Sequence, residues 1–295
     1  MWVRVLGSAA GGGSPQWNCG CPVCHRVRRG SGTPRSQSSI VVSPDRDRWF
    51  LVNASPDVRH QIEAFPGLHP RGSRDSPLRA CLLTDAEIDH TLGLLLLREA
   101  SGVRLFATPA VHKTLTDGSG LLPLLERFCP VEWTPVEPGA GFRLADGLWC
   151  EAFDVPTTKA DRFGTGTIPG RVVGYRFTDE NDGATVVYLP GAQRLGPAVR
   201  SEISGSDLLL LDGTCWHDDE LIDLGLAGKT SREMGHLPVL ESLAALDGLG
   251  VRRTVFVHMN NTNPILLDDS PEWLIVEENG MEVAMDGLEI QVVEQ

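Results

Sequence analysis

The stretch around which the chain is organised is ACLLTDAEIDH, residues 80–90. Its first four residues are apolar and of strand length, and a Leu-rich segment follows the polar heptad 84–90, so the heptad is expected at a strand's carboxyl end. Binding sites favour that position. Asp89 and His90 can turn toward one ion, and carboxylate oxygen with imidazole nitrogen suits zinc or iron. A solvated acidic loop is the alternative interpretation.

Two further apolar runs end in side chains of the same kind. Asp212 follows DLLLL at 207–211, and His258 follows TVFV at 254–257. Buried strands of this type deliver their last residues to one edge of a sheet, so we expect both side chains to join Asp89 and His90. A histidine that is merely hydrogen-bonded at a strand end is the other interpretation of His258.

His236 lies in MGHLP, residues 234–238, ahead of apolar residues at helical spacing, Val239, Leu240, Leu243 and Leu246. At the amino end of a helix the dipole favours the neutral imidazole. We therefore expect His236 to accept a proton or to bind a metal. Upstream, Asn53 follows an apolar run, where its side chain could orient a ligand residue or simply make a turn.

A second candidate metal site is a cluster of three thiols within six residues: Cys19, Cys21 and Cys24. A tetrahedral structural zinc needs one more ligand, for which we expect His217, with Cys215 or Asp218 as alternatives. Four protein ligands leave no open position, so this zinc would pin the loop near residues 15–30 and would not catalyse. Reduced thiols without a metal are the other interpretation.

The composition restricts the class of partner. The 295 residues include 26 basic and 39 acidic ones, a net charge of −13, which argues against binding to a nucleic-acid backbone. We expect a small-molecule or peptide-derived substrate. The amino-terminal segment lacks a signal-peptide h-region and no apolar run could span a membrane, so a cytoplasmic protein is expected. A homodimer is compatible with the sequence.

The remaining pattern predicts one α/β domain over residues 1–295. Hairpins are expected from 38–42 with 49–52, from 173–177 with 185–189, and from 281–284 with 288–292. The Leu-rich segment 92–97 is expected to be buried on most sides. Residues 157–166 predict a mobile loop able to cover a site, where Lys159 and Arg162 either meet a substrate carboxylate or are solvated.

The heptad lies where the metallo-β-lactamase superfamily carries HxHxDH, and nearly the whole chain resembles the pyrroloquinoline quinone (PQQ) biosynthesis protein B family. The matching stretches are LGSAAGGG at 6–13, PQWNC at 15–19, QSS at 37–39, NASPD at 53–57, LDGT at 211–214, MGHLP at 234–238 and residues 258–266. The resemblance implies a single-domain αββα sandwich with its metal site along one edge of the two sheets.

The resemblance also implies which ligands survive. Superfamily hydrolases hold two metals, but here Asp85 and Glu87 replace the first two motif histidines, and no histidine occurs at 154–159. The remaining set is two imidazoles with one or two carboxylates: Asp89, His90, His258 and Asp212. That set is close to the facial arrangement of non-haem iron(II) oxygenases, although zinc could also bind.

On this basis the chain is expected to hydroxylate a tyrosine-derived (Glu-Tyr) intermediate of PQQ biosynthesis with dioxygen. His236 would transfer a proton, while Asp85 and Glu87 would hydrogen-bond ligands or substrate amines. Two alternatives stand beside this hypothesis. One is a zinc hydrolase of phosphodiester or lactam type, which the missing histidines disfavour because two metals usually activate the water. The other is a carrier that binds the finished quinone for export.

Overall fold

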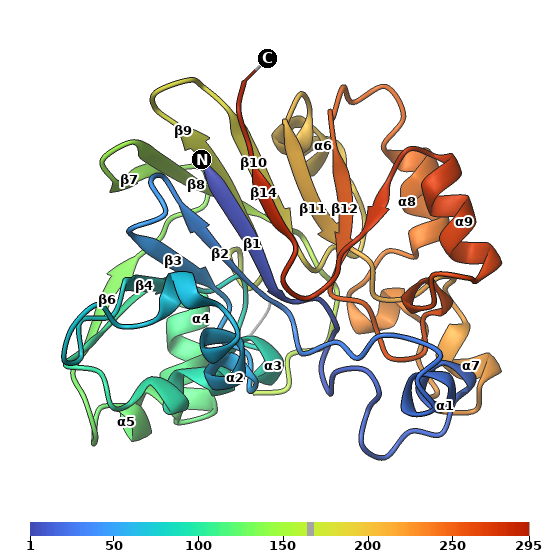
Figure 1. The fold of residues 1–295 in the computed structure, drawn as a ribbon, viewed down its shortest axis with the longest axis horizontal. Coiled ribbons are helices and arrows are strands. Elements are labelled where there is room, and N and C mark those ends of the chain that lie inside the picture. Colours follow the sequence, from blue (N-terminus) through green and yellow to red (C-terminus); the bar gives the residue numbers. More distant parts are fainter. Residues whose placement is uncertain (164–167, 295) are drawn as a thin grey trace.

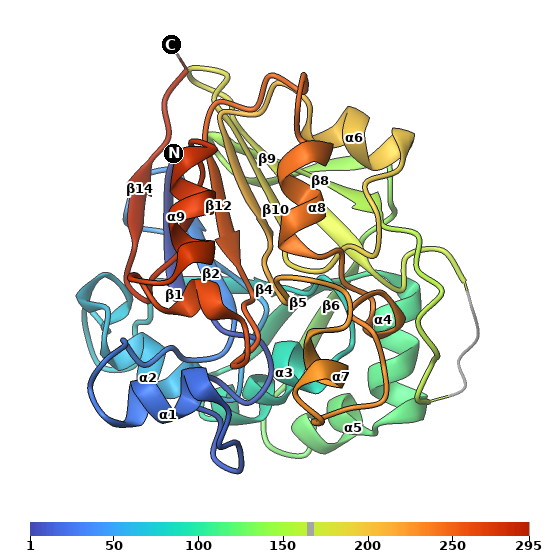
Figure 2. The same cartoon turned by 90° about the vertical axis from the view of Figure 1, so that its right-hand side faces the viewer.

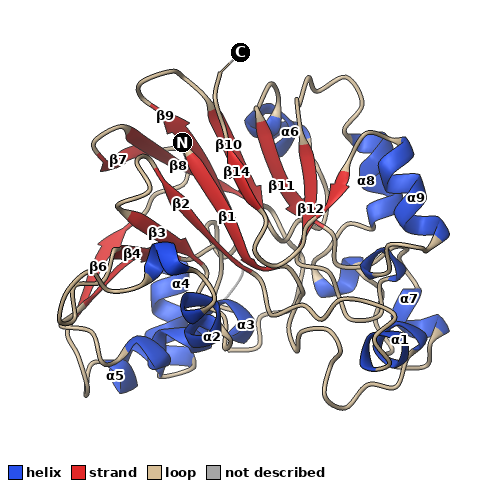
Figure 3. Cartoon of the chain, in the orientation of Figure 1, coloured by secondary structure: helices blue, strands red, loops and turns tan. Residues whose placement is uncertain are grey.

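The structure is a computed structural model that describes residues 1–163 and 168–294. Within these ranges the strands form two seven-stranded sheets that pack face to face, and helices cover both outer faces (Figures 1 and 3). This arrangement is the expected αββα sandwich. No described helix has both the length and the apolar character that crossing a bilayer requires.

The first sheet has the order β14-β1-β2-β3-β4-β5-β6. Strands β3 to β6 run parallel, whereas β1 pairs antiparallel with both β2 and β14. The antiparallel pairing of β2 with β3 confirms the first predicted hairpin. The bounds are β1 Trp2–Gly7, β2 Ser39–Ser43, β3 Trp49–Val52, β4 Leu78–Leu82, β5 Val103–Ala107, β6 Val131–Pro135 and β14 Glu289–Gln291.

The second sheet has the order β13-β12-β11-β10-β9-β8-β7. Its parallel part is β10 to β13, and the antiparallel pairing of β9 with β10 confirms the second predicted hairpin. The bounds are β7 Gly141–Ala145, β8 Leu148–Asp154, β9 Val173–Asp179, β10 Thr185–Leu189, β11 Leu208–Asp212, β12 Thr254–Val257 and β13 Glu282–Val283.

The helices are short, and several begin at a proline preceded by a capping residue. Their bounds are α1 Pro22–Arg28, α2 Val58–Glu63, α3 Ile88–Thr91, α4 Pro109–Lys113, α5 Leu121–Leu125, α6 Pro197–Ile203, α7 Glu220–Asp223, α8 Val239–Ala245 and α9 Pro271–Glu278. Turns of 3-10 helix occur at Pro66–Leu68, Leu92–Leu97, Arg232–Met234 and Pro264–Leu266, and a π-helical turn occurs at Thr114–Gly118.

The strands alternate between two apolar cores. In β3, Phe50 and Val52 face the core between the sheets, while Trp49 and Leu51 face the core beneath the outer helices. This alternation follows from the two-residue period of a strand. Every side chain of β11 is buried, because this strand is covered on both faces.

Two expectations about the chain are wrong. The segment Leu92–Leu97 is a 3-10 helix in which Leu94 is fully buried, but Leu92 and Leu96 are 37% and 43% exposed. The closing hairpin is not formed either. Instead β13 extends the second sheet beside β12, and β14 crosses to the first sheet and pairs with β1.

The carboxyl ends of β4, β11 and β12 meet at one edge of the sandwich, although β4 belongs to a different sheet from the other two. In Figures 1 and 2 this edge is at the bottom, near α3 and α7. The chain leaving β1 joins the two sheets there, since Ala10 N donates to the Met259 carbonyl at 2.7 Å and Met259 N donates to the Ser8 carbonyl at 3.0 Å. His258 is thereby fixed beside the first sheet.

Candidate metal centre

His90 lies in α3, just past β4, and is held by the carboxylate of Asp85. Its Nδ1 lies 2.9 and 2.8 Å from the two carboxylate oxygens, so Nδ1–H donates to Asp85, and in the neutral imidazole the lone pair is on Nε2. Among the described residues Nε2 is buried with no hydrogen-bond partner. A buried, unpaired polar nitrogen is costly, and a metal ion bound to the deprotonated Nε2 would satisfy it.

The two groups also control each other's charge. Burial opposes ionisation of Asp85, but the charge and hydrogen bond of His90 outweigh it and lower the pKa of Asp85 to about 2. Burial likewise opposes protonation of His90, yet the carboxylates of Asp85 and Asp89 raise its pKa to about 9. A metal that binds His90 must therefore displace a proton at neutral pH.

Asp89 and His258 complete a ligand set with His90. One donor atom from each of the three residues lies within 4.8 Å of the others, and His258 Nε2 is 3.4 Å from Asp89 Oδ2. His258 adopts a left-handed backbone (φ 58°), an unfavourable conformation that brings its ring to the site directly after β12. Gly11 lets the chain pass close by, because a Cβ there would be 3.0 Å from Asp89 Oδ2. The structure thus brings together three of the four predicted active-site ligands.

Asp212 does not join this group; it forms a second one with His236 and His258. Both of its oxygens are engaged. Oδ1 accepts from Thr214 N (3.0 Å) and Thr214 Oγ1 (2.6 Å), and Oδ2 accepts from Ala192 N (2.9 Å) and His236 Nδ1 (2.8 Å). His236 precedes α8 instead of opening it, so this carboxylate orients the imidazole more directly than the helix dipole does.

The sequence interpretation missed the role of Thr214. Its hydroxyl donates to Asp212, so it accepts from His258 Nδ1 at 2.9 Å and lies 3.0 Å from His236 Nδ1. Both imidazoles therefore carry their proton on Nδ1 and leave Nε2 free. The LDGT motif that contains Thr214 was the available signal.

Asn53 also supports the site. It has a left-handed backbone (φ 63°), and its side chain pairs with Thr84 through Nδ2 to Oγ1 (2.9 Å) and through Oδ1 to the Thr84 amide (3.0 Å). Thr84 Oγ1 is in turn 2.9 Å from Asp85 Oδ2. Asn53 therefore acts on His90 through Thr84 and Asp85, which agrees with the orienting role that was one of its two interpretations.

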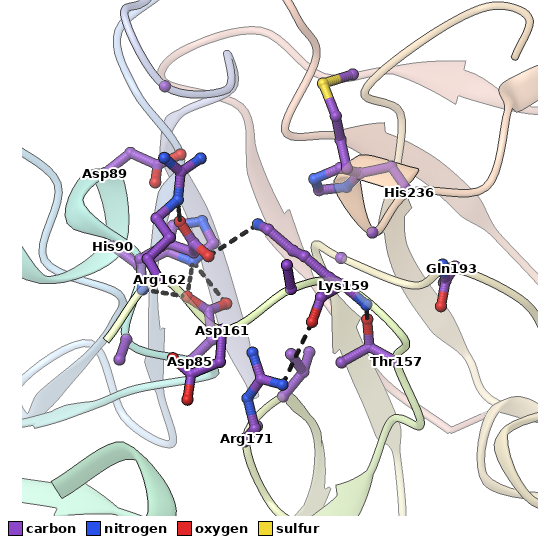
Figure 4. A pocket seen from close by; sticks show the side chains of 18 of the residues that line it. Asp85, Asp89, His90, Thr157, Lys159, Asp161, Arg162, Arg171, Gln193 and His236 are labelled. Atoms are coloured by element: carbon purple, nitrogen blue, oxygen red, sulfur yellow. Dashed lines mark hydrogen bonds and ion pairs between the residues drawn. The ribbon is translucent and has the colours of Figure 1, made fainter. Parts of the chain in front are cut away.

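A cavity of about 470 Å³ opens beside these residues, and Figure 4 shows the ring of His236 pointing into it. Glu87 lines the cavity. The Glu87 carboxylate lies 2.8 Å from Lys159 Nζ and 3.8 Å from Arg162 Nε, and so it is paired with cations and not with a metal ligand. Of the predicted covering loop, residues 164–166 lie outside the described part.

The three clustered thiols of Cys19, Cys21 and Cys24 are buried and mutually within 4.8 Å, a geometry that could hold a zinc ion. The expected fourth ligand, His217, is not brought to this cluster. Its ring is 43% exposed and faces Asp223 of the following helix at 3.9 Å. The alternatives Cys215 and Asp218 do not join the described cluster either.

Asn261, and not His217, contacts the cysteine cluster. Its carbonyl oxygen is 3.5 Å from Cys21 Sγ and 3.7 Å from Cys24 Sγ, and its Nδ2 is 3.2 Å from Cys24 Sγ. The residue belongs to the MNNTN segment directly after His258, so the cysteine cluster and the candidate active site share one loop.

Comparison with known proteins supports this architecture. Residues 48–259 match the model of the β-lactamase superfamily domain. The coenzyme PQQ synthesis protein B of Azotobacter vinelandii is 44% identical, over 99% of this chain and all of that protein, and that of Methylococcus capsulatus is 42% identical over 98% and 99%.

Among solved structures, zinc-bound PqqB from Methylobacterium extorquens has a TM-score of 0.91 and 40% identity, covering 99% of this chain and 100% of that one. A diphosphatase of the PhnP family, at a TM-score of 0.72 and 21% identity over 100% and 98%, shares the fold. Full-length identity above 40%, together with agreement of the whole backbone, means that this chain belongs to the coenzyme PQQ synthesis protein B family of the β-lactamase superfamily.

Proposed function

We propose that the chain acts in PQQ biosynthesis as an oxygen-dependent hydroxylase of a tyrosine-derived (Glu-Tyr) intermediate, with one non-haem iron(II) in its active site. The observation that carries this proposal is the group of two imidazoles and one carboxylate, His90, His258 and Asp89, beside a substrate-sized cavity. Such a set leaves positions open on the ion. The place in PQQ biosynthesis is supported by the full-length relatives.

The residues that surround this group determine which nitrogen of each imidazole carries the proton. Asp85 holds the Nδ1 proton of His90, and Thr214 holds that of His258, so both Nε2 atoms are free for one ion. Bound iron(II) supplies the activation of dioxygen. His236, fixed by Asp212, exchanges a proton through Nε2 with a molecule in the cavity.

A single-turnover experiment tests the proposal. Protein reconstituted with iron(II) without oxygen is mixed with the Glu-Tyr dipeptide, and dioxygen and ascorbate are then added. We expect a product heavier by one oxygen atom in the mass spectrum, and none from His258→Ala. If iron-loaded protein with the correct metal content yields no oxygenated product, the hydroxylase proposal fails.

A zinc hydrolase is the second candidate, because His258 is shared with a second potential ligand group, Asp212 and His236, and because the similar PqqB structure contains zinc. Two zinc ions in the active site, together with cleavage of a phosphodiester, would support it. A carrier would instead bind the quinone tightly without turnover by either metal form.

A further inference from the structure

The cavity contains an arginine, Arg171, whose charge no described residue balances through an ion pair. Arg171 is half-buried, and within residues 1–163 and 168–294 its guanidinium makes one hydrogen bond, from Nη1 to the Lys159 carbonyl at 3.3 Å, and no ion pair. The other cations of this wall differ, because Lys159 and Arg162 already face Glu87. The remaining N–H donors of Arg171 have no acceptor among the residues that the structure describes.

An unbalanced guanidinium in a half-buried position needs an anion. Removing charge from water costs free energy that only a partner can offset, and a planar guanidinium matches a carboxylate through two parallel hydrogen bonds. The nearby Asp154 forms no ion pair with Arg171, and its Oδ1 accepts from the Gly170 amide at 2.6 Å. The position therefore suits a carboxylate that enters with a ligand.

The surroundings hold Arg171 in place before any ligand binds. The Lys159 amide donates to Thr157 Oγ1 at 3.1 Å, and Lys159 Nζ reaches across to Glu87 at 2.8 Å. The stem of Lys159 passes against Gly235, where a Cβ would be 3.1 Å from Lys159 Cδ. The carbonyl that positions Arg171 is thus fixed from both sides of the cavity.

The rest of the cavity lining carries more acidic than basic side chains, since its other cations are Lys159 and Arg162, which face Glu87, and the exposed Lys229. Its lining includes five acidic side chains: Asp85, Glu87, Asp89, Asp161 and Glu233. In Figure 4 the guanidinium of Arg171 lies below Lys159, on the opposite side of the view from Asp89 and His236. A ligand with one anionic end would therefore place that end at Arg171 and its other end toward the metal ligands.

We propose that Arg171 is the carboxylate-binding residue of the cavity and sets the orientation of an amino-acid or short-peptide substrate, an inference that rests on the proposed function. Arg171 fixes the anionic end of the substrate. The aromatic end then lies toward Asp89, His90 and His258. Lys159 is the positioning residue, because it acts through its carbonyl on Arg171.

Calorimetric titration of zinc-loaded, full-length protein tests this without turnover. The probes are the dipeptide Glu-Tyr, its carboxyl-terminal amide and Gln-Tyr, so each carboxylate is removed once. We expect one of the two neutral analogues to bind native protein about 10–100-fold more weakly, as a charge-assisted pair requires. In Arg171→Gln the affinity for the Glu-Tyr dipeptide falls by the same factor, and the dipeptide and that analogue then bind equally.

Arg162→Gln is the matched control, since Arg162 is 71% exposed and 3.8 Å from Glu87, and it should keep the discrimination. A folding defect would weaken all probes equally and leave their ratio unchanged. The inference is overturned if native protein binds all three probes alike, or if Arg171→Gln retains the native ratio. Discrimination without hydroxylation would remove only the proposed function, and hydroxylation without discrimination only this inference.

Discussion

Replacing Asp85 by Asn should change the metal affinity of the active site in a pH-dependent way. The Asp85 carboxylate contacts His90 Nδ1 at 2.8 and 2.9 Å, Thr84 Oγ1 at 2.9 Å and the Glu87 amide at 2.9 Å. An Asn side chain has the same shape and one acceptor oxygen, so the fold should be kept. The negative charge beside His90 is lost.

Two effects of this change oppose each other. Loss of a carboxylate that supports a ligand histidine weakens metal binding about 10–100-fold. In native metal-free protein, however, a pKa of about 9 for His90 means that a proton competes with the metal, by about 100-fold at pH 7 and only about twofold at pH 9. Without Asp85 the pKa of His90 returns toward its ordinary value of about 6.5, and this competition nearly vanishes.

We therefore expect the Asp85→Asn protein to bind zinc at pH 7 as tightly as native protein or up to about 8-fold more tightly, and to be about 5–50-fold weaker at pH 9. Competition with a chromophoric chelator measures this, after the cysteine cluster has been filled. Asp154→Asn removes a carboxylate bonded only to the Gly170 amide among the described residues. The ratio of its zinc affinity to that of native protein should not change with pH. An affinity ratio independent of pH would contradict the Asp85–His90 coupling.

The same pair sets the pH dependence of the metal-free fold. The pKa of His90 is raised and that of Asp85 is lowered in the folded state. The contribution of this pair to the free energy of unfolding is therefore fully present between about pH 4 and 6.5. It is lost as pH rises through about 9 or falls through about 2. Chemical denaturation of metal-free Asp85→Asn protein should lack this dependence.

Three further substitutions separate the two metal sites and the core. Cys24→Ser should lose one zinc per chain and lower the melting temperature while leaving the metal bound to His258, as elemental analysis and calorimetry would show. Thr214→Val, which removes the hydroxyl that accepts from His258 Nδ1 and lies 3.0 Å from His236 Nδ1, should lower kcat at least tenfold at a stability cost of about 1–3 kcal/mol, measured by single turnover and urea unfolding. Leu211→Ala, in the fully buried β11, should cost about 2–5 kcal/mol in the same unfolding assay, and a smaller cost would mean that the strand tolerates a cavity.

The local chain pattern predicts the strand ends well because burial and periodicity are local properties. His258 directly follows an apolar run, and Asp89 and His90 lie in the polar heptad that begins where another apolar run ends; parallel strands bring such ends to one edge. Long-range pairing is not local. The pattern of residues 281–292 resembles a hairpin, yet β14 pairs with β1 at the other end of the chain. The Leu-rich run 92–97 carries no period, so its exposed face could not be identified from sequence.

The same distinction explains which site residues the sequence revealed. A histidine that follows a strand can be recognised from the sequence as a candidate ligand. Thr214 and Asn261 are common polar residues, and their roles arise only from their neighbours in the fold. His217 illustrates the converse. It has the right chemistry for the cysteine cluster, but α7 begins three residues later and its ring turns to Asp223.

The number of metals and the role of His236 follow from the same carboxylate. Asp212 receives four hydrogen bonds, so it could bridge a second ion only by giving up contacts to Thr214, Ala192 or His236. If it gave up His236, the imidazole would lose the partner that fixes its proton on Nδ1 and leaves Nε2 toward the cavity. A second ion held by Asp212, His236 and His258 would also take the His236 imidazole as a ligand, whereas a site with one ion leaves that imidazole available for proton transfer. Mononuclear loading and proton transfer by His236 are for this reason expected to be gained or lost together.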